Sequence, residues 1–304
     1  MRRALSLRLQ ELLKFYGREV VAPLIDAATA GGTTNPQIMR LLGIRRKSVA
    51  LLDPGPLAFW RANGNLVKRE YEQWATWLRT TPLSAPPILS SAGASSEVAH
   101  LFNEILYGVG LNDESLWTAI TGDAHNRRAL CEVFLEDVGH SVCPYCDIDT
   151  VRGAYYFDHF VPRSLSPYLA VAPENLYLAC GTCNSPQLGK GNRITFPAAR
   201  PDTNDSGSRL FFSFCAGAIE VEAPRAPAEA NVFSTLQLRR RYAGAVVYRD
   251  VMTKAQRVYE SALRTATPFS LSDLLTYHQR DYMPDPLYFA TRAALADTYW
   301  GDVE

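Results

Sequence analysis

The stretch from Cys143 to Arg193 decides the fold, and it reads CPYCDIDTVRGAYYFDHFVPRSLSPYLAVAPENLYLACGTCNSPQLGKGNR. Two Cys-x2-Cys pairs lie near its ends, Cys143 with Cys146 and Cys180 with Cys183. Four thiolates in two such turns complete a tetrahedral zinc site without any other ligand. The 33 residues between the two pairs are more than a zinc finger usually has, so we expect a folded insert there.

The insert has the pattern of two strands joined by a long loop. Residues 153–160 are rich in tyrosine and phenylalanine, which favour strands. Residues 161–174 contain prolines that cannot pair regularly in a sheet, so this part is expected to be a loop. Residues 175–180 are mostly apolar and predict the return strand, and a short helix is expected from about Asn184.

In this arrangement zinc holds the base of the hairpin against the short helix. Asp158 and His159 lie near the end of the first strand, and Asn184 directly follows the last cysteine. These three side chains can therefore converge on one polar site beside the zinc, without binding it. Histidine is the natural base at neutral pH, and a carboxylate with an amide oxygen can hold a hard divalent cation.

The order of these residues resembles the HNH nuclease family, which has the ββα-metal fold. The resemblance covers roughly 55 of 304 residues and is carried by Cys-x2-Cys, Asp-His-x-x-Pro, Asn-Leu, Cys-x2-Cys-Asn and Lys-Gly. It implies that His159 is the general base and that Asp158 and Asn184 bind a catalytic Mg²⁺ or Mn²⁺. It also implies that Asn175 braces the loop that carries the histidine, and that the four cysteines form a structural Zn²⁺ site.

Three residues near the end of the stretch have more than one interpretation. Lys190 and Arg193 either contact the phosphates of a nucleic acid or are solvated charges. Asn184 can also cap the helix that is expected to follow it. Residues 185–189 form a longer connection to Lys190 than the family usually has, and Asn192 is a weaker alternative metal ligand.

The composition is that of an ordinary globular protein, with 47% hydrophobic and 20% charged residues and a formal net charge of zero. Residues 1–80 carry 13 Lys or Arg against 6 Asp or Glu, whereas residues 81–150 carry 2 against 10. The basic part either touches nucleic acid or docks on the acidic part. No run approaches the ~20 apolar residues that span a bilayer, and no signal-peptide core is present, so we expect a cytoplasmic protein without membrane attachment.

Helical patterns dominate outside the insert. Helices are expected over residues 4–28, 34–42, 57–78, 97–107, 112–120, 123–138, 234–265, 270–278 and 285–298. A small hairpin is expected about Gly217, between residues 210–214 and 218–221. The prediction is a mainly α chain, α+β overall, with an embedded ββα-metal zinc module. Its three parts are a helical region (1–138), the zinc module (139–200) and a mainly helical region (201–304).

Some other residues have a structural and a functional interpretation. The tryptophans of helix 57–78 are more typical of a core than of a base-stacking platform. The arginines 239–241 are either a solvated helix face or part of a stripe that follows phosphates. The basic cluster 45–47 fits a turn in a helical bundle better than a helix-turn-helix reader. Cys131 and Cys215 are expected to be buried free thiols.

These observations predict a metal-dependent HNH endonuclease that hydrolyses DNA phosphodiesters. A small module of this kind on a helical body resembles effectors of bacterial and phage conflict systems, in which another protein supplies target sensing. No phosphate-binding glycine loop occurs in the sequence, so any ATPase activity would come from a partner protein. Two alternatives remain: a catalytically silent zinc module that binds nucleic acid or protein, and a nuclease that acts on RNA.

Overall fold

The computed structural model of the chain describes residues 7–29, 54–80, 82–138, 143–147, 155–201, 210–215, 217–265, 270–282 and 287–298. These residues are mostly helical, with two small two-stranded sheets, which agrees with the predicted α+β class. The chain forms two compact units. We call Leu5–Asp137 with Phe157–Tyr177 the N-terminal unit, and Val138–Tyr156 with Leu178–Glu304 the C-terminal unit.

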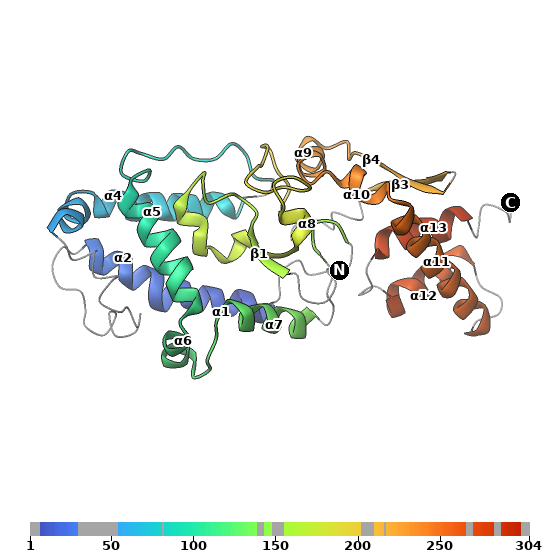
Figure 1. Cartoon of the computed structure of the whole chain (residues 1–304), viewed down its shortest axis with the longest axis horizontal. Helices are drawn as coiled ribbons and strands as arrows, with labels where there is room; N and C mark the ends of the chain where they lie inside the picture. The colour runs from blue at the N-terminus through green and yellow to red at the C-terminus, as the bar shows by residue number, and fades with distance from the viewer. Residues whose placement is uncertain are drawn as a thin grey trace. The chain divides into compact units, whose positions relative to one another are not determined.

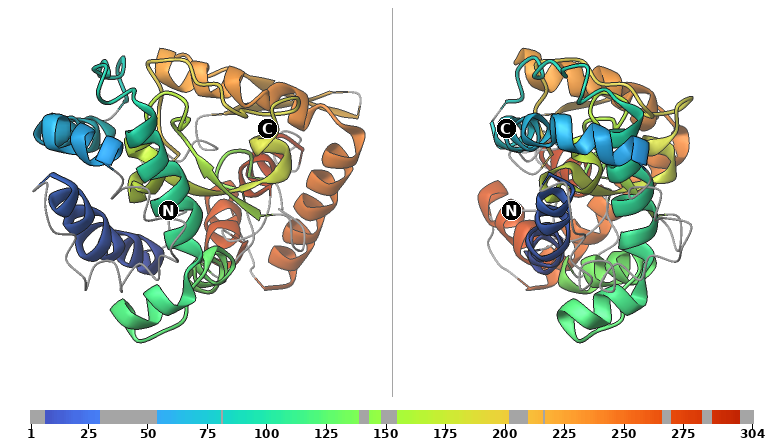
Figure 2. Two further views of the ribbon diagram at one scale, coloured as in Figure 1. Left: turned by 60° about the vertical axis from the view of Figure 1, so that its left-hand side comes forward. Right: turned by 90° about the vertical axis from the view of Figure 1, so that its left-hand side faces the viewer.

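The N-terminal unit is built from helices of very different length (Figure 1). In chain order they are α1 (Leu7–Tyr16), the π-helical η1 (Gly17–Val21), α2 (Ala22–Thr29), α4 (Pro54–Leu78), α5 (Ser96–Ala99), the π-helical η3 (His100–Val109), the 3-10 turn η4 (Gly110–Asn112), α6 (Glu114–Thr121) and α7 (Arg127–Val138). Helix α2 packs against α4, and both are drawn in blue in Figure 2.

Most of the predicted helices of this unit are confirmed. The helix expected over 4–28 is the continuous run of α1, η1 and α2, and Trp60 and Trp74 of α4 are buried core residues. Helix α7 begins at Arg127 and not at residue 123, because the Asn126 side chain caps it by accepting a hydrogen bond from the amide of Ala129. The predictions for residues 34–42 and 45–47 lie outside the described residues.

The predicted strand–loop–strand insert is present. Strands β1 (Tyr155–His159) and β2 (Leu176–Cys180) form one two-stranded sheet, and the boundary between the two units passes through both strands. The proline-rich loop between them folds into two 3-10 turns, η5 (Pro167–Val171) and η6 (Pro173–Asn175). Turn η5 packs against η3 and α4 of the N-terminal unit.

The short helix after the insert differs from the prediction. Helix α8 (Gly181–Asn184) ends at Asn184, where a helix was expected to begin, so Asn184 does not cap a helix start. The cap is Cys180 instead, whose Sγ accepts a hydrogen bond from the amide of Cys183 at 3.4 Å. The cysteine spacing therefore places the start of the helix three residues earlier than the sequence pattern alone suggested.

The C-terminal unit continues with a hairpin and a group of helices. Strands β3 (Phe211–Cys215) and β4 (Ala218–Glu222) pair antiparallel about Gly217, whose φ of +83° suits glycine, as predicted. The helices are α9 (Pro227–Thr235), α10 (Leu238–Tyr242), α11 (Ala245–Thr265), α12 (Leu271–Tyr282) and α13 (Tyr288–Thr298).

The prediction of a single long helix over residues 234–265 is wrong, because this part of the chain forms the end of α9, then α10 and α11. The chain breaks it twice, at Gln237, which has a left-handed φ of +53°, and around Gly244 between α10 and α11. Helical periodicity continues across these residues, but one left-handed residue ends a helix. No helix among the described residues has the length and apolar character needed to cross a membrane.

Candidate metal centre and active site

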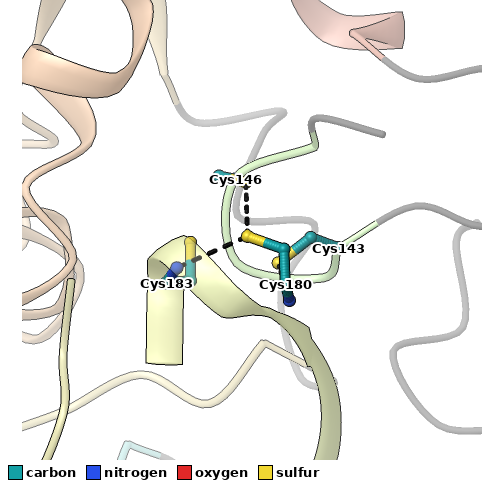
Figure 3. A group of neighbouring side chains, drawn as sticks. All are labelled: Cys143, Cys146, Cys180 and Cys183. Carbon is teal, nitrogen blue, oxygen red and sulfur yellow. Dashed lines mark hydrogen bonds between the residues drawn. The ribbon is translucent and has the colours of Figure 1, made fainter. Parts of the chain in front are cut away.

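The four cysteines of the two Cys-x2-Cys pairs come together in the C-terminal unit (Figure 3). Their Sγ atoms all lie within 4.8 Å of one another, and all four residues are buried. Zinc–sulfur bonds of about 2.3 Å in a tetrahedron place sulfurs about 3.8 Å apart. The Sγ atoms of Cys146 and Cys180 are 3.9 Å apart, so the cluster can hold a metal ion such as zinc.

The first cysteine turn is held by later parts of the chain. The amide of Asp147 closes the turn by donating to the carbonyl of Cys143 at 2.9 Å. The Tyr242 hydroxyl of α10 donates to the carbonyl of Cys146 at 2.7 Å. The Asp147 carboxylate accepts from the amide of Phe289 in α13 at 3.1 Å. The turn is therefore fixed by residues about a hundred or more positions away in the sequence.

The second cysteine turn is held by the segment that follows it. The amide of Lys190 donates to the carbonyl of Cys183 at 2.8 Å. A Cβ on Gly189 would lie 2.3 Å from that same carbonyl oxygen, so only glycine allows this close approach. The bare backbone of Gly189 is therefore needed beside the cysteine turn.

Arg241 contacts the cluster, although the sequence interpretation had placed it on a helix surface. Its Nη2 donates to Sγ of Cys180 at 3.6 Å and to Sγ of Cys146 at 3.7 Å. Burial by itself lowers the pKa of this guanidinium, but the attraction of the thiolates, Cys146 first, outweighs it and raises the pKa overall. Arg239 and Arg240 are exposed, so the three arginines do not share one role.

The charges of the cluster also favour a bound cation. Hydrogen bonds from the other three cysteine side chains lower the pKa of the Cys180 thiol. Burial, followed by hydrogen bonds with Cys146 and Cys180, raises the pKa of the Cys143 thiol. Four buried thiolates therefore do not coexist without compensation, and a bound dication with Arg241 nearby would supply it.

The two remaining cysteines are free, but only one is partly buried. Cys131 is half-buried, and burial raises its pKa to about 12. Cys215 is exposed, so its predicted burial is wrong. Strand β3 alternates exposed and partly buried residues, and Cys215 lies in the exposed register.

His159 and Asp158 lie at the end of β1 in the N-terminal unit, and both are buried, 8% and 4% exposed. The Nε2 of His159 is 2.8 Å from the carbonyl oxygen of Ala170 in η5. A carbonyl oxygen only accepts hydrogen bonds, so Nε2 carries the proton and the lone pair of the neutral ring is on Nδ1. The ring also packs on Tyr107, with centroids 4.7 Å apart.

Asn175 is fully buried and binds the loop that follows His159 at two places, Val161 and Leu169. Its Oδ1 accepts from the amide of Val161 at 2.7 Å, and its Nδ2 donates to the carbonyl of Val161 at 2.9 Å. The same Nδ2 donates to the carbonyl of Leu169 at 3.1 Å. An asparagine satisfies this arrangement because one side chain supplies both an acceptor and donors.

A second buried contact anchors the same loop to helix α4. The Tyr168 hydroxyl of η5 donates to Oε2 of Glu70 at 2.9 Å, and the other oxygen of Glu70 accepts from the amide of Ser90. Ala170, which binds His159, lies two residues after Tyr168. The position of the imidazole is thus determined through the backbone of η5.

The remaining predicted site residues lie in the C-terminal unit. Asn184 is half-buried at the end of α8. Lys190 is 2% exposed and its ammonium donates to the carbonyl of Gly191, so it does not present a charge at the surface. Arg193 is exposed, but its Nη2 donates to the carbonyls of Gly189 and Pro186.

Comparison of the chain with protein-family models, with curated proteins and with solved structures finds no match. The resemblance to HNH nucleases therefore rests on the residue order in the sequence. The geometry of the cysteines and of the histidine loop is independent of that resemblance.

Proposed function

We propose that the chain is a metal-dependent endonuclease that hydrolyses phosphodiester bonds of DNA. The observation that carries the proposal is the fixed imidazole of His159. The hydrogen bond to the Ala170 carbonyl fixes the tautomer of the ring, and the ring packs on Tyr107. Asp158 directly precedes His159 in strand β1. A histidine held in one tautomer is the arrangement expected of a general base.

In this proposal His159 acts through Nδ1. The lone pair on Nδ1 accepts a proton from a water molecule as its oxygen forms a bond to phosphorus, and the bond from phosphorus to the leaving oxygen breaks. The leaving oxygen takes a proton from solvent. The Nε2–H bond to Ala170 keeps the ring oriented while it carries the positive charge.

A divalent cation such as Mg²⁺ or Mn²⁺ would neutralise charge on the leaving oxygen. Asp158 is the carboxylate proposed to bind it, and the resemblance adds Asn184 as a second oxygen ligand. The four cysteines have another task, because a closed set of four sulfur ligands leaves no position for substrate or water. Their zinc would hold the second turn, where β2 ends and α8 begins.

The experiment is cleavage of supercoiled plasmid DNA with and without Mg²⁺ or Mn²⁺. The wild-type chain should cleave only with the added metal, and His159→Ala should abolish cleavage while its zinc content stays unchanged. Asp158→Ala and Asn184→Ala test the two proposed metal ligands in the same assay. Cleavage by His159→Ala at the wild-type rate would remove this residue from the mechanism.

Two other functions make different predictions. A catalytically silent zinc module predicts DNA or protein binding that survives Asp158→Ala, with no metal-dependent cleavage. A nuclease specific for RNA predicts cleavage of an RNA substrate under conditions in which plasmid stays intact. The His159 variant distinguishes all three when both substrates are used. A partner protein that supplies sensing or ATPase activity remains part of the proposal, since such effectors work in larger systems.

A further inference from the structure

Tyr107 of η3 lies at the centre of a cluster of cationic and imidazole groups in the N-terminal unit. Its ring centroid is 4.7 Å from that of His159, 4.7 Å from Cζ of Arg163 and 5.1 Å from Cζ of Arg127. Tyr107 itself is 7% exposed, so the ring is a packed platform. The two arginines come from different segments, the loop after β1 and the first residue of α7.

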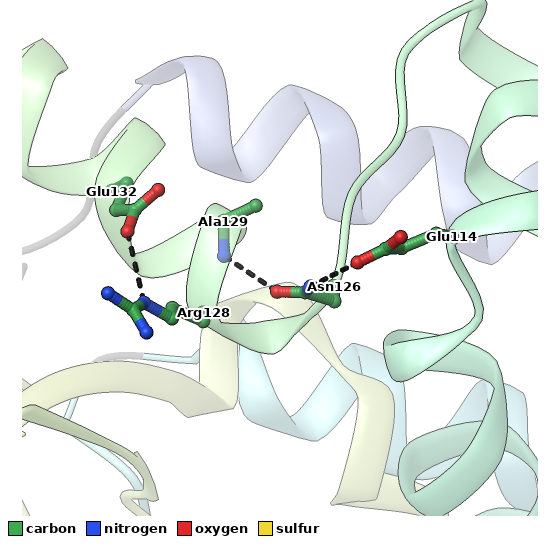
Figure 4. A network of polar contacts seen from close by, with 5 residues as sticks. All are labelled: Glu114, Asn126, Arg128, Ala129 and Glu132. Carbon is green, nitrogen blue, oxygen red and sulfur yellow. Dashed lines mark hydrogen bonds and ion pairs between the residues drawn. The ribbon is translucent and has the colours of Figure 1, made fainter.

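Helix α7 begins with a network of polar contacts around Asn126, the residue that precedes Arg127 (Figure 4). Asn126 caps the helix by accepting from the amide of Ala129 at 2.9 Å, and its Nδ2 donates to Glu114 at 2.6 Å. The Nε of Arg127 donates to Oδ1 of Asn112 at 3.0 Å. A guanidinium has five N–H donors, and this contact uses one of them. The terminal nitrogens of Arg127 therefore keep donors for another acceptor.

Arg163 lies four residues after His159, in the loop that Asn175 braces. It is half-buried, and its Cζ lies over the ring of Tyr107 in a cation–π contact. The donors at the edge of the guanidinium are not used by that contact. Within the described part of the chain, no carboxylate forms an ion pair with Arg163 or with Arg127.

We propose that Arg127 and Arg163, arranged around Tyr107, bind the phosphate backbone of a nucleic acid next to His159. The proposal rests on the proposed nuclease function, because it assigns the contact that holds the substrate at that site. Two guanidiniums that pair with no carboxylate of the described residues, and that both contact one aromatic ring, suit an anion better than a structural role. Phosphate accepts bidentate hydrogen bonds from the edge of a guanidinium.

The distances allow both groups to act on the same phosphodiester. Cζ of Arg163 and the centre of the His159 ring are no farther apart than twice 4.7 Å, since each lies 4.7 Å from the Tyr107 centroid. A phosphorus atom lies about 4 Å from the carbon of a guanidinium that binds it. An attacking water lies about 3 Å from phosphorus and about 3 Å from its base. From the guanidinium through phosphorus and water to the base, these distances add to about 10 Å. This is enough to join Arg163 and His159 through one phosphodiester.

The test is equilibrium binding of a short fluorescein-labelled DNA duplex to the full chain. Every variant is made in the His159→Ala background with Mg²⁺ present, so that binding is measured without cleavage. We expect Arg163→Gln and Arg127→Gln each to weaken binding about 10-fold or more, because each removes a charge-assisted contact. Each should also reduce the slope of log K against log salt by about one.

Arg128→Gln is the matched control, because it removes one charge from the same helix at an 89% exposed side chain that pairs with Glu132. It should leave both affinity and salt slope near the starting values. Arg163→Lys keeps the charge without the planar fork and should show an intermediate loss. Circular dichroism of every variant checks that the fold is retained.

Equal losses for Arg127→Gln, Arg163→Gln and Arg128→Gln would overturn the proposal, as would no loss in any of them. Undetectable binding by the parent chain would also overturn it. The outcome is separable from that of the proposed function, because binding in the His159→Ala background does not depend on cleavage. A chain that binds through these arginines without ever cleaving would keep this inference and reject the nuclease.

Discussion

The guanidinium of Arg241 donates a hydrogen bond to Sγ of Cys180 at 3.6 Å, although the two residues are 61 positions apart. A second contact from the same Nη2 reaches Cys146 at 3.7 Å. The cationic side chain of α10 therefore touches one cysteine from each pair. A tetrathiolate site that binds Zn²⁺ carries two negative charges, and Arg241 offsets one of them inside the protein.

Arg241→Ala is expected to weaken the metal site. Loss of a group that binds the metal ligands typically lowers metal affinity by 10- to 100-fold. The measurement is the rate at which a chromogenic chelator removes zinc from the native protein. Arg240→Ala is the control, because this neighbouring arginine is exposed. Equal zinc release from the two variants would show that the contacts of Arg241 with sulfur have no effect on the metal.

Cys180→Ser is expected to remove one of four ligands and with it most of the bound zinc. Structural zinc in small domains contributes on the order of 10 kcal/mol to folding, so protection from proteolysis around the cysteine turns should be lost as well. Cys215→Ser changes an exposed free thiol and should keep one zinc per chain. Metal analysis of both purified variants decides the matter, and full zinc occupancy in Cys180→Ser would contradict the assignment.

Asn175→Ala is expected to destabilise the N-terminal unit by about 2–4 kcal/mol, because it leaves buried backbone groups of the histidine loop without partners. Three hydrogen bonds are lost, two to Val161 and one to Leu169. Urea unfolding measures the change in the free energy of unfolding. Asn192→Ala, at an exposed position, should change that free energy by less than about 0.5 kcal/mol. If the two variants have nearly the same free energy of unfolding, Asn175 does not brace the histidine loop.

Stability is expected to fall at alkaline pH because of two buried tyrosines. Burial raises the pKa of Tyr16, and burial followed by the hydrogen bond to Glu70 raises the pKa of Tyr168. Both stay protonated in the folded chain, whereas a tyrosine of the unfolded chain loses its proton near pH 10. Their contribution is therefore complete below about pH 10, and each costs about 1.4 kcal/mol per pH unit above it.

The variant that tests this pH dependence is Tyr168→Phe. Above about pH 10, the free energy of unfolding of this variant should fall less steeply with pH than that of the wild-type chain. The difference in slope should be the contribution of one tyrosine, about 1.4 kcal/mol per pH unit. The slope is the quantity to compare, because the substitution also removes the hydrogen bond to Glu70 and lowers stability at every pH. Urea unfolding over that pH range provides it. A slope equal to that of the wild-type chain would mean that Tyr168 ionises normally when folded.

Local patterns in the sequence were sufficient for much of the fold. The two Cys-x2-Cys turns, the strand–loop–strand insert and the hairpin about Gly217 were predicted and are present. The cysteine turns and the hairpin about Gly217 depend on residues within a few positions of one another, so their spacing could be recognised in the sequence, although distant residues such as Tyr242 hold the first cysteine turn in place. Helix boundaries were less accurate, since a single left-handed residue, Gln237, divides a periodic pattern that looked continuous.

The contacts that tune these sites could not be read from the sequence. Arg241 looked like one of three surface arginines, and Tyr107 like a helix residue far from His159 in the chain. Lys190 was expected either to contact phosphate or to be a solvated charge, yet it is buried and its ammonium donates to a backbone carbonyl.

By itself, then, the sequence determined that four thiolates would gather and that a histidine would end the first strand of the hairpin. The tertiary structure decided which side chains surround them. The physical reason is that turn geometry depends on neighbours along the chain, whereas the packing of Arg241 on sulfur and of Tyr107 on imidazole depends on how distant helices come together.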